Sequence, residues 1–160
     1  MKWKSSALIA IFSLCLLTAI ATAQTKQPNL TGTWKMNAEK SKFEQGGPSD
    51  ITLKFDHKDI SLSETLMLTT PNGDRSVEAK YTTDGKEATQ EVMGGRQAQT
   101  SAKWEGETLT IAWKAEDGSF VRKITVSADG KTMTMIVNQT RGGGQSVTDT
   151  VVLEKQEAKK

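Results

Sequence analysis

The chain of 160 residues is poor in the side chains that most often carry chemistry, with one cysteine, one histidine and one tyrosine. Cys15 lies in an N-terminal segment that we expect to be removed, so the mature chain can form neither an intramolecular disulfide nor a thiolate metal site. His57 without a second histidine argues against zinc. Neither a nucleophile with its base nor a pair of catalytic carboxylates can be assembled. The sequence therefore predicts a protein that is not an enzyme, with no catalytic residues, no metal and no cofactor.

The sequence also lacks a strong charge of one sign and a second long apolar run. Its 21 Lys and Arg face 19 Asp and Glu, and removal of Lys2 and Lys4 with the leader leaves 19 of each. A balanced charge gives no reason to expect a nucleic acid partner. Glycine runs at 94–96 and 141–144 lack the Gly-Lys-Ser/Thr ending of a phosphate-binding loop. No membrane span is expected in the mature chain.

The first residues have the composition of a Sec-type signal peptide. Lys2 and Lys4 precede an apolar run from Ala7 to Ile20, and Ala21-Thr22-Ala23 supplies the small residues that a signal peptidase recognises. We expect cleavage after Ala23, so that residues 1–23 are the signal peptide and residues 24–160 form a single domain. The mature protein is then periplasmic or secreted.

Turns that contain glycine recur along the mature chain at a nearly constant step of about a dozen residues, which leaves room for strands and tight turns but not for helices. Between the turns, apolar residues alternate with polar ones, as in strands with one dry face. Ten strands are expected, marked by the apolar sets Leu30/Trp34/Met36, Ile51/Leu53/Phe55, Ile60/Leu62/Leu66/Leu68, Val77/Ala79/Tyr81, Ala88/Val92, Ala98/Ala102/Trp104, Leu109/Ile111/Trp113, Phe120/Ile124/Val126, Met133/Met135/Val137 and Val147/Val151/Leu153.

Sequential antiparallel strands leave two exposed edges unless the first strand pairs with the last. The sequence therefore predicts an all-β fold, an up-and-down antiparallel barrel of about 8–10 strands. A membrane barrel is disfavoured because the turns are short and the apolar face carries charges. Asn37 to Asp50 breaks the rhythm, and we expect a short helical turn and a loop there.

A resemblance to a known group begins at Gly32-Thr33-Trp34, a Gly-x-Trp motif in the first expected strand. It resembles the opening of the lipocalin-like (calycin) barrels, which include lipocalins, fatty-acid-binding proteins and avidins. The string from Gly32 to Phe43 is also similar to the start of small secreted bacterial proteins of this type. The resemblance implies a structural role at one barrel end for Gly32 and Trp34, with Lys155 from the last strand packed across the tryptophan.

Three charged residues occur in the apolar phase of their strands: Glu64, Arg122 and Asp149. A buried charge needs a partner. The partner of Arg122 could be a ligand carboxylate, as in the fatty-acid-binding branch that the chain resembles. It could equally be Asp149 or Glu64, or a bulge could turn the charge outward.

The predicted function is non-covalent binding of a small, mostly hydrophobic molecule in the barrel interior, with Arg122 or Tyr81 fixing a polar end. The candidate ligand contacts are Arg122, Tyr81, Trp113, Glu64 and Phe55. The single histidine, His57, could in addition hold a haem.

The alternative prediction is a protein-interaction or inhibitory module of the cell envelope, with a packed barrel and binding loops at Arg141–Gln145, Asn37–Asp50 and Gly94–Gln97. Whether the barrel is hollow or packed separates the two functions.

Overall fold

The computed structural model describes residues 27–92 and 95–157, and the predicted signal peptide lies outside this part. The described chain forms ten β-strands at the positions that the apolar alternation predicts. They are β1 (Gly32–Met36), β2 (Asp50–Lys58), β3 (Ser61–Thr70), β4 (Gly73–Thr82), β5 (Ala88–Val92), β6 (Arg96–Glu105), β7 (Thr108–Ala115), β8 (Gly118–Val126), β9 (Thr132–Arg141) and β10 (Ser146–Lys155).

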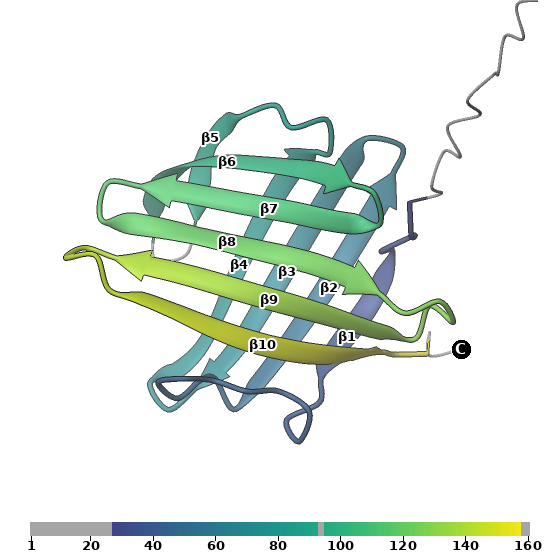
Figure 1. Cartoon of the computed structure of the whole chain (residues 1–160), viewed down its shortest axis with the longest axis horizontal. Helices are drawn as coiled ribbons and strands as arrows, with labels where there is room; N and C mark the ends of the chain where they lie inside the picture. Colours follow the sequence, from purple (N-terminus) through teal and green to yellow (C-terminus); the bar gives the residue numbers. More distant parts are fainter. Residues whose placement is uncertain (1–26, 93–94, 158–160) are drawn as a thin grey trace, which may run out of the picture.

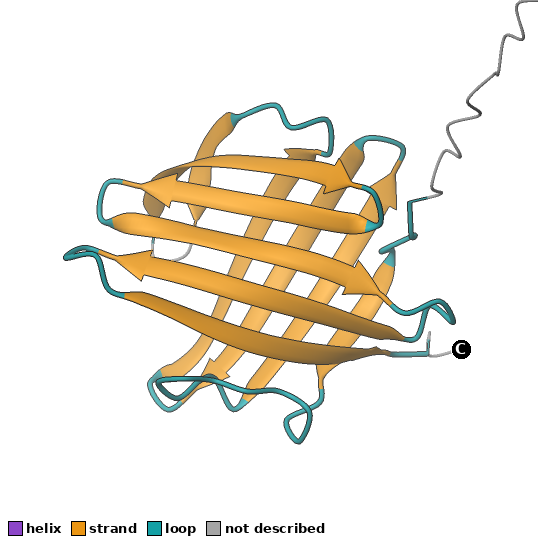
Figure 2. Cartoon of the chain, in the orientation of Figure 1, coloured by secondary structure: helices purple, strands orange, loops and turns teal. Residues whose placement is uncertain are grey.

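All strands belong to one antiparallel sheet with the order β4-β3-β2-β1-β10-β9-β8-β7-β6-β5. The sheet curls into a nearly closed barrel, in which β6 to β10 cross the front of Figure 1 and β1 to β4 run obliquely behind them. Strands and short loops make up the whole described chain (Figure 2). The predicted all-β, up-and-down barrel is thereby confirmed. Within the described ranges, no helix is long and apolar enough to cross a membrane.

The first and last strands pair, as predicted, so neither of them is an exposed edge of the sheet. In the register of β1 and β10, Trp34 faces Lys155. The Lys155 Nζ lies 5.1 Å from the centroid of the Trp34 ring, and Trp34 Nε1 donates a hydrogen bond of 2.8 Å to the Leu30 carbonyl. Gly32 allows this arrangement, since a Cβ atom there would lie 2.9 Å from Lys155 Cε.

The remaining gap, between β4 and β5, is bridged by a side chain. Gln90 Oε1 accepts a bond of 3.0 Å from the Lys80 N–H, and Gln90 Nε2 donates one of 3.0 Å to the Lys80 carbonyl. The amide thus replaces a strand partner for Lys80. Gln90 Nε2 also donates to Thr100 Oγ1 at 2.6 Å, which joins β4 to β6 through β5.

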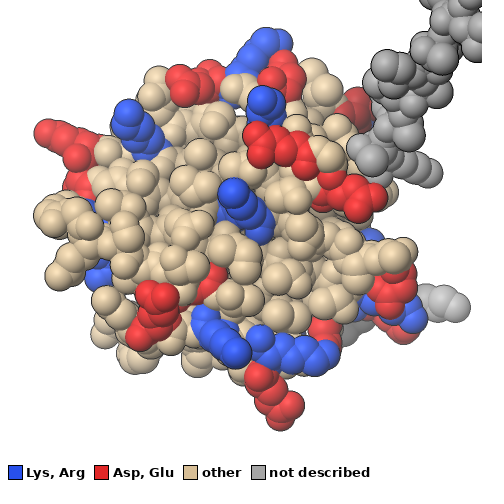
Figure 3. Space-filling view, in the orientation of Figure 1, with Lys and Arg blue, Asp and Glu red and all other residues tan. Residues whose placement is uncertain are grey.

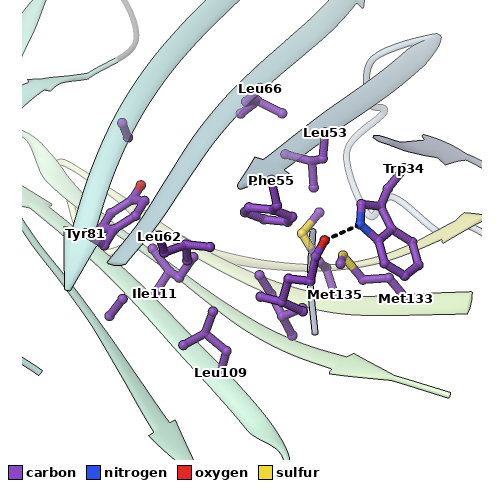
Figure 4. Packing of buried hydrophobic residues seen from close by; sticks show 14 of the residues in the cluster. Trp34, Leu53, Phe55, Leu62, Leu66, Tyr81, Leu109, Ile111, Met133 and Met135 are labelled. Carbon is purple, nitrogen blue, oxygen red and sulfur yellow. Dashed lines mark hydrogen bonds between the residues drawn. The ribbon is translucent and has the colours of Figure 1, made fainter. Parts of the chain in front are cut away.

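The apolar phase of every strand points into the barrel and fills much of it. Figure 4 shows part of this cluster, with Trp34 beside Met133 and Leu62 beside Ile111. Ile60 does not belong to it: the prediction placed it in the third strand, but it lies in the β2–β3 turn and is 54% exposed. Ala88, at the start of the short strand β5, is also exposed, whereas the other predicted apolar residues keep their inward phase, so no bulge reverses it.

The segment between β1 and β2 folds back against β10. Ser41 N–H donates to the Asn37 carbonyl at 3.1 Å, which closes one turn of helical type, as expected. Further on, Glu44 N–H donates to Asp149 Oδ1 at 2.9 Å, so the inward-phase carboxylate of Asp149 is used to fix this loop. Phe43 is partly buried against the core cluster at the same end of the barrel.

Candidate functional site

A cluster of four polar or aromatic side chains, hereafter the interior cluster, lies inside the barrel. Glu64 comes from β3, Tyr81 from β4, Trp113 from β7 and Arg122 from β8. Each has the same inward phase as the apolar residues of its strand, because successive residues of a strand point to opposite faces. The curl of the sheet places β3 and β4 across the interior from β7 and β8 (Figure 1). Residues far apart in the sequence therefore meet in the lumen.

The centre of the interior cluster is an ion pair between Arg122 and Glu64. Arg122 Nη2 donates to Glu64 Oε2 at 2.6 Å, and Arg122 Nη1 donates to Glu64 Oε1. The two side chains are each only 1% exposed. Of the partners that the sequence left open for Arg122, the structure contains Glu64. Bidentate geometry suits such a site because both carboxylate oxygens receive a charge-assisted bond.

The pair keeps its charges despite burial. Removal from water works against the positive charge of Arg122, but the Coulombic attraction of Glu64 and the hydrogen bonds that it accepts outweigh this and raise the pKa of Arg122. The guanidinium carbon also lies 5.3 Å from the centroid of the Trp113 ring and 5.6 Å from that of Phe120. Both contacts add cation–π attraction. The ion pair is electrically neutral, although Arg122 Nε is buried and has no hydrogen-bond partner in the described part of the chain.

Hydrogen bonds extend the pair to the other two members of the interior cluster. Tyr81 donates its hydroxyl proton to Glu64 Oε2 at 3.2 Å, and Trp113 Nε1 donates to the Tyr81 hydroxyl at 2.7 Å. Burial, followed by the Coulombic effect of Glu64, raises the pKa of Tyr81 well above its ordinary value of 10.0. Tyr81 therefore remains a neutral hydrogen-bond donor, and the carboxylate of Glu64 receives three bonds in all.

A pocket with a volume of about 330 Å³ opens beside this cluster, at the end of the barrel that carries the β5–β6, β7–β8 and β9–β10 turns. Its aromatic walls are Trp113 and Phe120, whose ring centroids lie 5.4 Å apart. The remaining lining residues are Val92, Arg96, Ala98, Ala115, Asp117, Gly118, Ser119, Gln139, Thr140, Arg141 and Gly142. Because Trp113 and Phe120 also contact Arg122, the pocket borders the interior cluster without including its ion pair.

A second pocket, of about 250 Å³, lies at the gap between β4 and β5. Tyr81 forms part of its wall, together with Ser61, Lys80, Thr82, Lys86, Glu87, Ala88 and Thr100. Tyr81 thus lines this second pocket and also belongs to the interior cluster.

Four of the five predicted ligand contacts meet in the interior cluster, but only Trp113 lines the larger pocket and Tyr81 the smaller one, and Arg122 and Glu64 line neither. The fifth, Phe55, is 1% exposed in the packed part of the core, where its backbone pairs with that of Glu64 on the next strand. It lines neither pocket. Sequence reasoning did not select Phe120, Ala98 or Gln139 as contacts, although each has the inward phase close to a turn. Their inward phase together with their position near turns at one end of the predicted barrel could have identified them as pocket residues.

His57 lines neither pocket and stacks on Trp104, with the ring centroids 6.0 Å apart. Its Nε2 is enclosed and has no hydrogen-bond partner. An iron could reach this atom only if neighbouring side chains moved. Within residues 27–92 and 95–157, no group of three or more His, Cys, Asp or Glu side chains is arranged to hold a metal ion.

The outer surface carries charges of both signs. In Figure 3, Lys and Arg side chains are interspersed with Asp and Glu over the visible face. Ion pairs such as Lys40–Glu154 and Lys86–Asp84 lie in exposed positions, where they contribute little to stability. On the face shown, no continuous patch of one sign gathers.

Comparison with solved structures finds barrels of the fatty-acid-binding type. A REP1-NXSQ fatty acid transporter matches with a TM-score of 0.62 and 16% identity, over 81% of this chain and 98% of that chain. The fatty-acid-binding protein 1 of Echinococcus granulosus matches with a TM-score of 0.59 and 13% identity, over 80% and 98% of the chains. A secretory abundant heat soluble protein of Ramazzottius varieornatus matches with a TM-score of 0.62 and 10% identity, over 84% and 100%.

These likenesses show the fold, a calycin-like antiparallel barrel of the type seen in fatty-acid-binding proteins, as the Gly-x-Trp resemblance implied. No protein-family model matches the sequence, and no curated protein matches it by sequence.

Proposed function

We propose that the protein binds a small, mostly apolar molecule non-covalently at the open end of its barrel. The observation that carries this proposal is the pocket of about 330 Å³ walled by Trp113 and Phe120. Ligand pockets in proteins are typically concave and about 300–1,000 Å³ in volume, so the size of this one suits a small ligand, and its lining combines aromatic walls with polar and charged side chains. Affinity would come from burial, at about 0.8 kcal/mol for each methylene removed from water.

The solved structures that share the fold support this choice of function. Two of them are described as a fatty acid transporter and a fatty-acid-binding protein. A barrel of this kind can keep a lumen at one end while large side chains fill the other, as Trp34 and its neighbours do here. We therefore propose a binding role and not a catalytic one.

The test is a titration of the purified protein with Nile red, an uncharged lipophilic dye, followed by dye emission and tryptophan quenching. Saturable one-to-one binding is expected. Ala115→Phe, which fills the pocket, should weaken binding by about tenfold or more, since tenfold corresponds to about 1.4 kcal/mol. Ala112→Phe is the matched control, because Ala112 lies on the same strand in the opposite phase and lines neither pocket.

Absence of saturable dye binding to a folded sample would contradict a ligand-binding barrel. It would favour the second candidate, an interaction module of the cell envelope. One observation supports that candidate. The β1–β2 loop, the β9–β10 loop and the described part of the β5–β6 turn lie at the same end of the barrel, where Arg96 and Arg141 line the pocket. Charge reversal at Arg141 would then be the first variant to test for loss of a partner.

Export is part of the proposal and is supported by the sequence of residues 1–23. Expression in a bacterial host, followed by N-terminal sequencing of the periplasmic or medium fraction, tests it. The expected N-terminus is Gln24. Recovery of the protein only from the cytoplasm, with residues 1–23 retained, would contradict it.

A further inference from the structure

Arg122, the cation that lies behind the two aromatic walls of the pocket, is already neutralised from within, whereas Arg96 and Arg141 belong to the pocket lining and Arg96 pairs there with Asp117. Arg122 contacts both aromatic walls, yet two of its nitrogens donate to Glu64, and the pair is almost fully enclosed. A ligand carboxylate that approached Arg122 would bring a third charge into this enclosed space. The sum would be one uncompensated negative charge, which a medium of low polarity strongly disfavours.

Glu64 cannot easily give way to such a ligand. Besides the two bonds from Arg122, its carboxylate accepts the Tyr81 hydroxyl, which is held in turn by Trp113 Nε1. Displacing Glu64 would leave its charge buried without a partner and would break the hydrogen-bond chain. The cost of an unpaired buried charge exceeds the gain from exchanging one carboxylate for another.

The wall of the pocket offers a neutral polar group instead. Gln139 lines the pocket in the inward phase of β9, and its side-chain amide makes no hydrogen bond to the described part of the chain. An amide both donates and accepts, so it can pair with a hydroxyl or a carbonyl oxygen without introducing charge. The apolar walls of Trp113, Phe120 and Ala98 would surround the rest of such a molecule.

We propose that the barrel selects uncharged ligands, apolar molecules whose polar group is a hydroxyl or a carbonyl, and rejects the corresponding carboxylates. This rests on the proposed ligand-binding function and specifies its ligand class. The competing arrangement places an acidic head group at the mouth of the pocket. Arg141 is exposed there and could hold a carboxylate in solvent while the tail points inward.

The experiment compares decanol with decanoate, which share a chain length and differ in the charge of the head group, as competitors for bound Nile red at pH 8. Decanol should displace the dye at a concentration lower by about tenfold or more, the factor expected when a charge must be buried against a neutral equivalent. As the pH falls through the ordinary carboxyl range, about 4 to 5, the acid becomes neutral and its affinity should approach that of decanol. Decanol measured at each pH corrects for changes in the protein.

Two variants assign the effect to the residues. Glu64→Gln leaves Arg122 with an uncompensated charge, so the preference should shift towards decanoate by about tenfold or more. Gln139→Leu should weaken decanol by about fivefold, the loss of one neutral hydrogen bond, while Gln145→Leu in the exposed β9–β10 loop should not. If Glu64→Gln does not fold, the pH series on the unmodified protein still tests whether the barrel rejects a charged head group.

Equal or tighter binding of decanoate at pH 8 would overturn the inference and leave the binding function intact. Loss of decanoate binding in Arg141→Ala would then establish the arrangement in which the acidic head group lies at the mouth of the pocket. Failure of Nile red, decanol and decanoate alike to bind a folded sample would overturn the binding function itself, and the ligand class with it.

Discussion

Arg122 and Glu64 are 58 residues apart in the sequence and form a bidentate ion pair across the inside of the barrel. Their strands, β8 and β3, are not neighbours in the sheet, because β9, β10, β1 and β2 lie between them. The pair therefore joins two parts of the barrel wall that no backbone hydrogen bond connects.

Removing one partner of this pair should be much more damaging than removing both. Glu64→Leu or Arg122→Met alone leaves a buried charge unpaired and should lower the free energy of unfolding by about 3–5 kcal/mol. The double variant has no charge to bury and should fall within about 1–2 kcal/mol of the original protein. Urea denaturation of the four proteins measures the cycle. Lys40→Met, in an exposed pair with Glu154, should change stability by less than about 1 kcal/mol.

The opposite result is equally informative. Single variants that lose no more than the double variant would mean that the two charges are separately solvated, and the enclosed pair would then be refuted.

Tyr81 should make the protein sensitive to alkaline pH. Its pKa is raised in the folded state, chiefly by burial, so the folded protein holds the hydroxyl proton after the unfolded chain has lost it. This stabilisation is fully present below pH 10, the unfolded value, and declines above it by about 1.4 kcal/mol per pH unit. Because Tyr81 is the only tyrosine, the ultraviolet absorbance of tyrosinate reports it alone. Ionisation should appear only together with unfolding.

Tyr81→Phe should abolish this part of the alkaline decline. At neutral pH it should cost about 1–3 kcal/mol, since Trp113 Nε1 loses its acceptor. A tyrosinate signal that titrates near pH 10 in the folded protein would contradict the enclosed hydroxyl.

The strands and the inward residues could be predicted from the sequence because both depend on a local period. Alternation places Leu109, Ile111 and Trp113 on one face whatever the rest of the chain does. The same period showed that Glu64 and Arg122 point inward and need partners. One exception, Ile60, is apolar but falls in a turn, where burial no longer follows alternation.

The identity of the partners could not be predicted in the same way. From the sequence, either Glu64 or Asp149 could pair with Arg122, because the choice depends on how the sheet curls. In the structure, Asp149 instead accepts a hydrogen bond from the backbone N–H of the loop residue Glu44. The position of the pocket could not be predicted from the sequence for a similar reason. Its position depends on how side chains such as Phe120 and Phe55 fill space, and no period of the sequence records that.

Gln90 should control the opening of the barrel wall at the β4–β5 gap. Its amide supplies both an acceptor and a donor to the backbone of Lys80. Gln90→Ala should lower the free energy of unfolding by about 1–2 kcal/mol and speed amide hydrogen exchange at Lys80. Gln99→Ala, an exposed glutamine on neighbouring β6, is the control and should do neither. Unchanged exchange at Lys80 in Gln90→Ala would show that the gap is closed by other contacts.

Gly118 should be irreplaceable at the point where the β7–β8 hairpin meets β9. Its φ of +152° disfavours any other residue, and a Cβ atom there would lie 2.2 Å from the Thr140 carbonyl oxygen. Gly106 provides a matched control, because its φ of +63° is also positive but no atom lies within 4 Å of the added Cβ. Gly106→Ala should cost about 1–2 kcal/mol, the strain of a positive φ.

Gly118→Ala should cost about 3 kcal/mol or more, because overpacking against a backbone atom adds to that strain. The pairing of Gly118 with Arg141 would have to loosen, and both residues line the pocket. We therefore expect Gly118→Ala to weaken Nile red binding as well as lower the midpoint of urea denaturation, whereas Gly106→Ala affects the midpoint alone. Equal losses of stability in the two variants, with dye binding intact in both, would mean that β8 and β9 can separate at this point without disturbing the pocket.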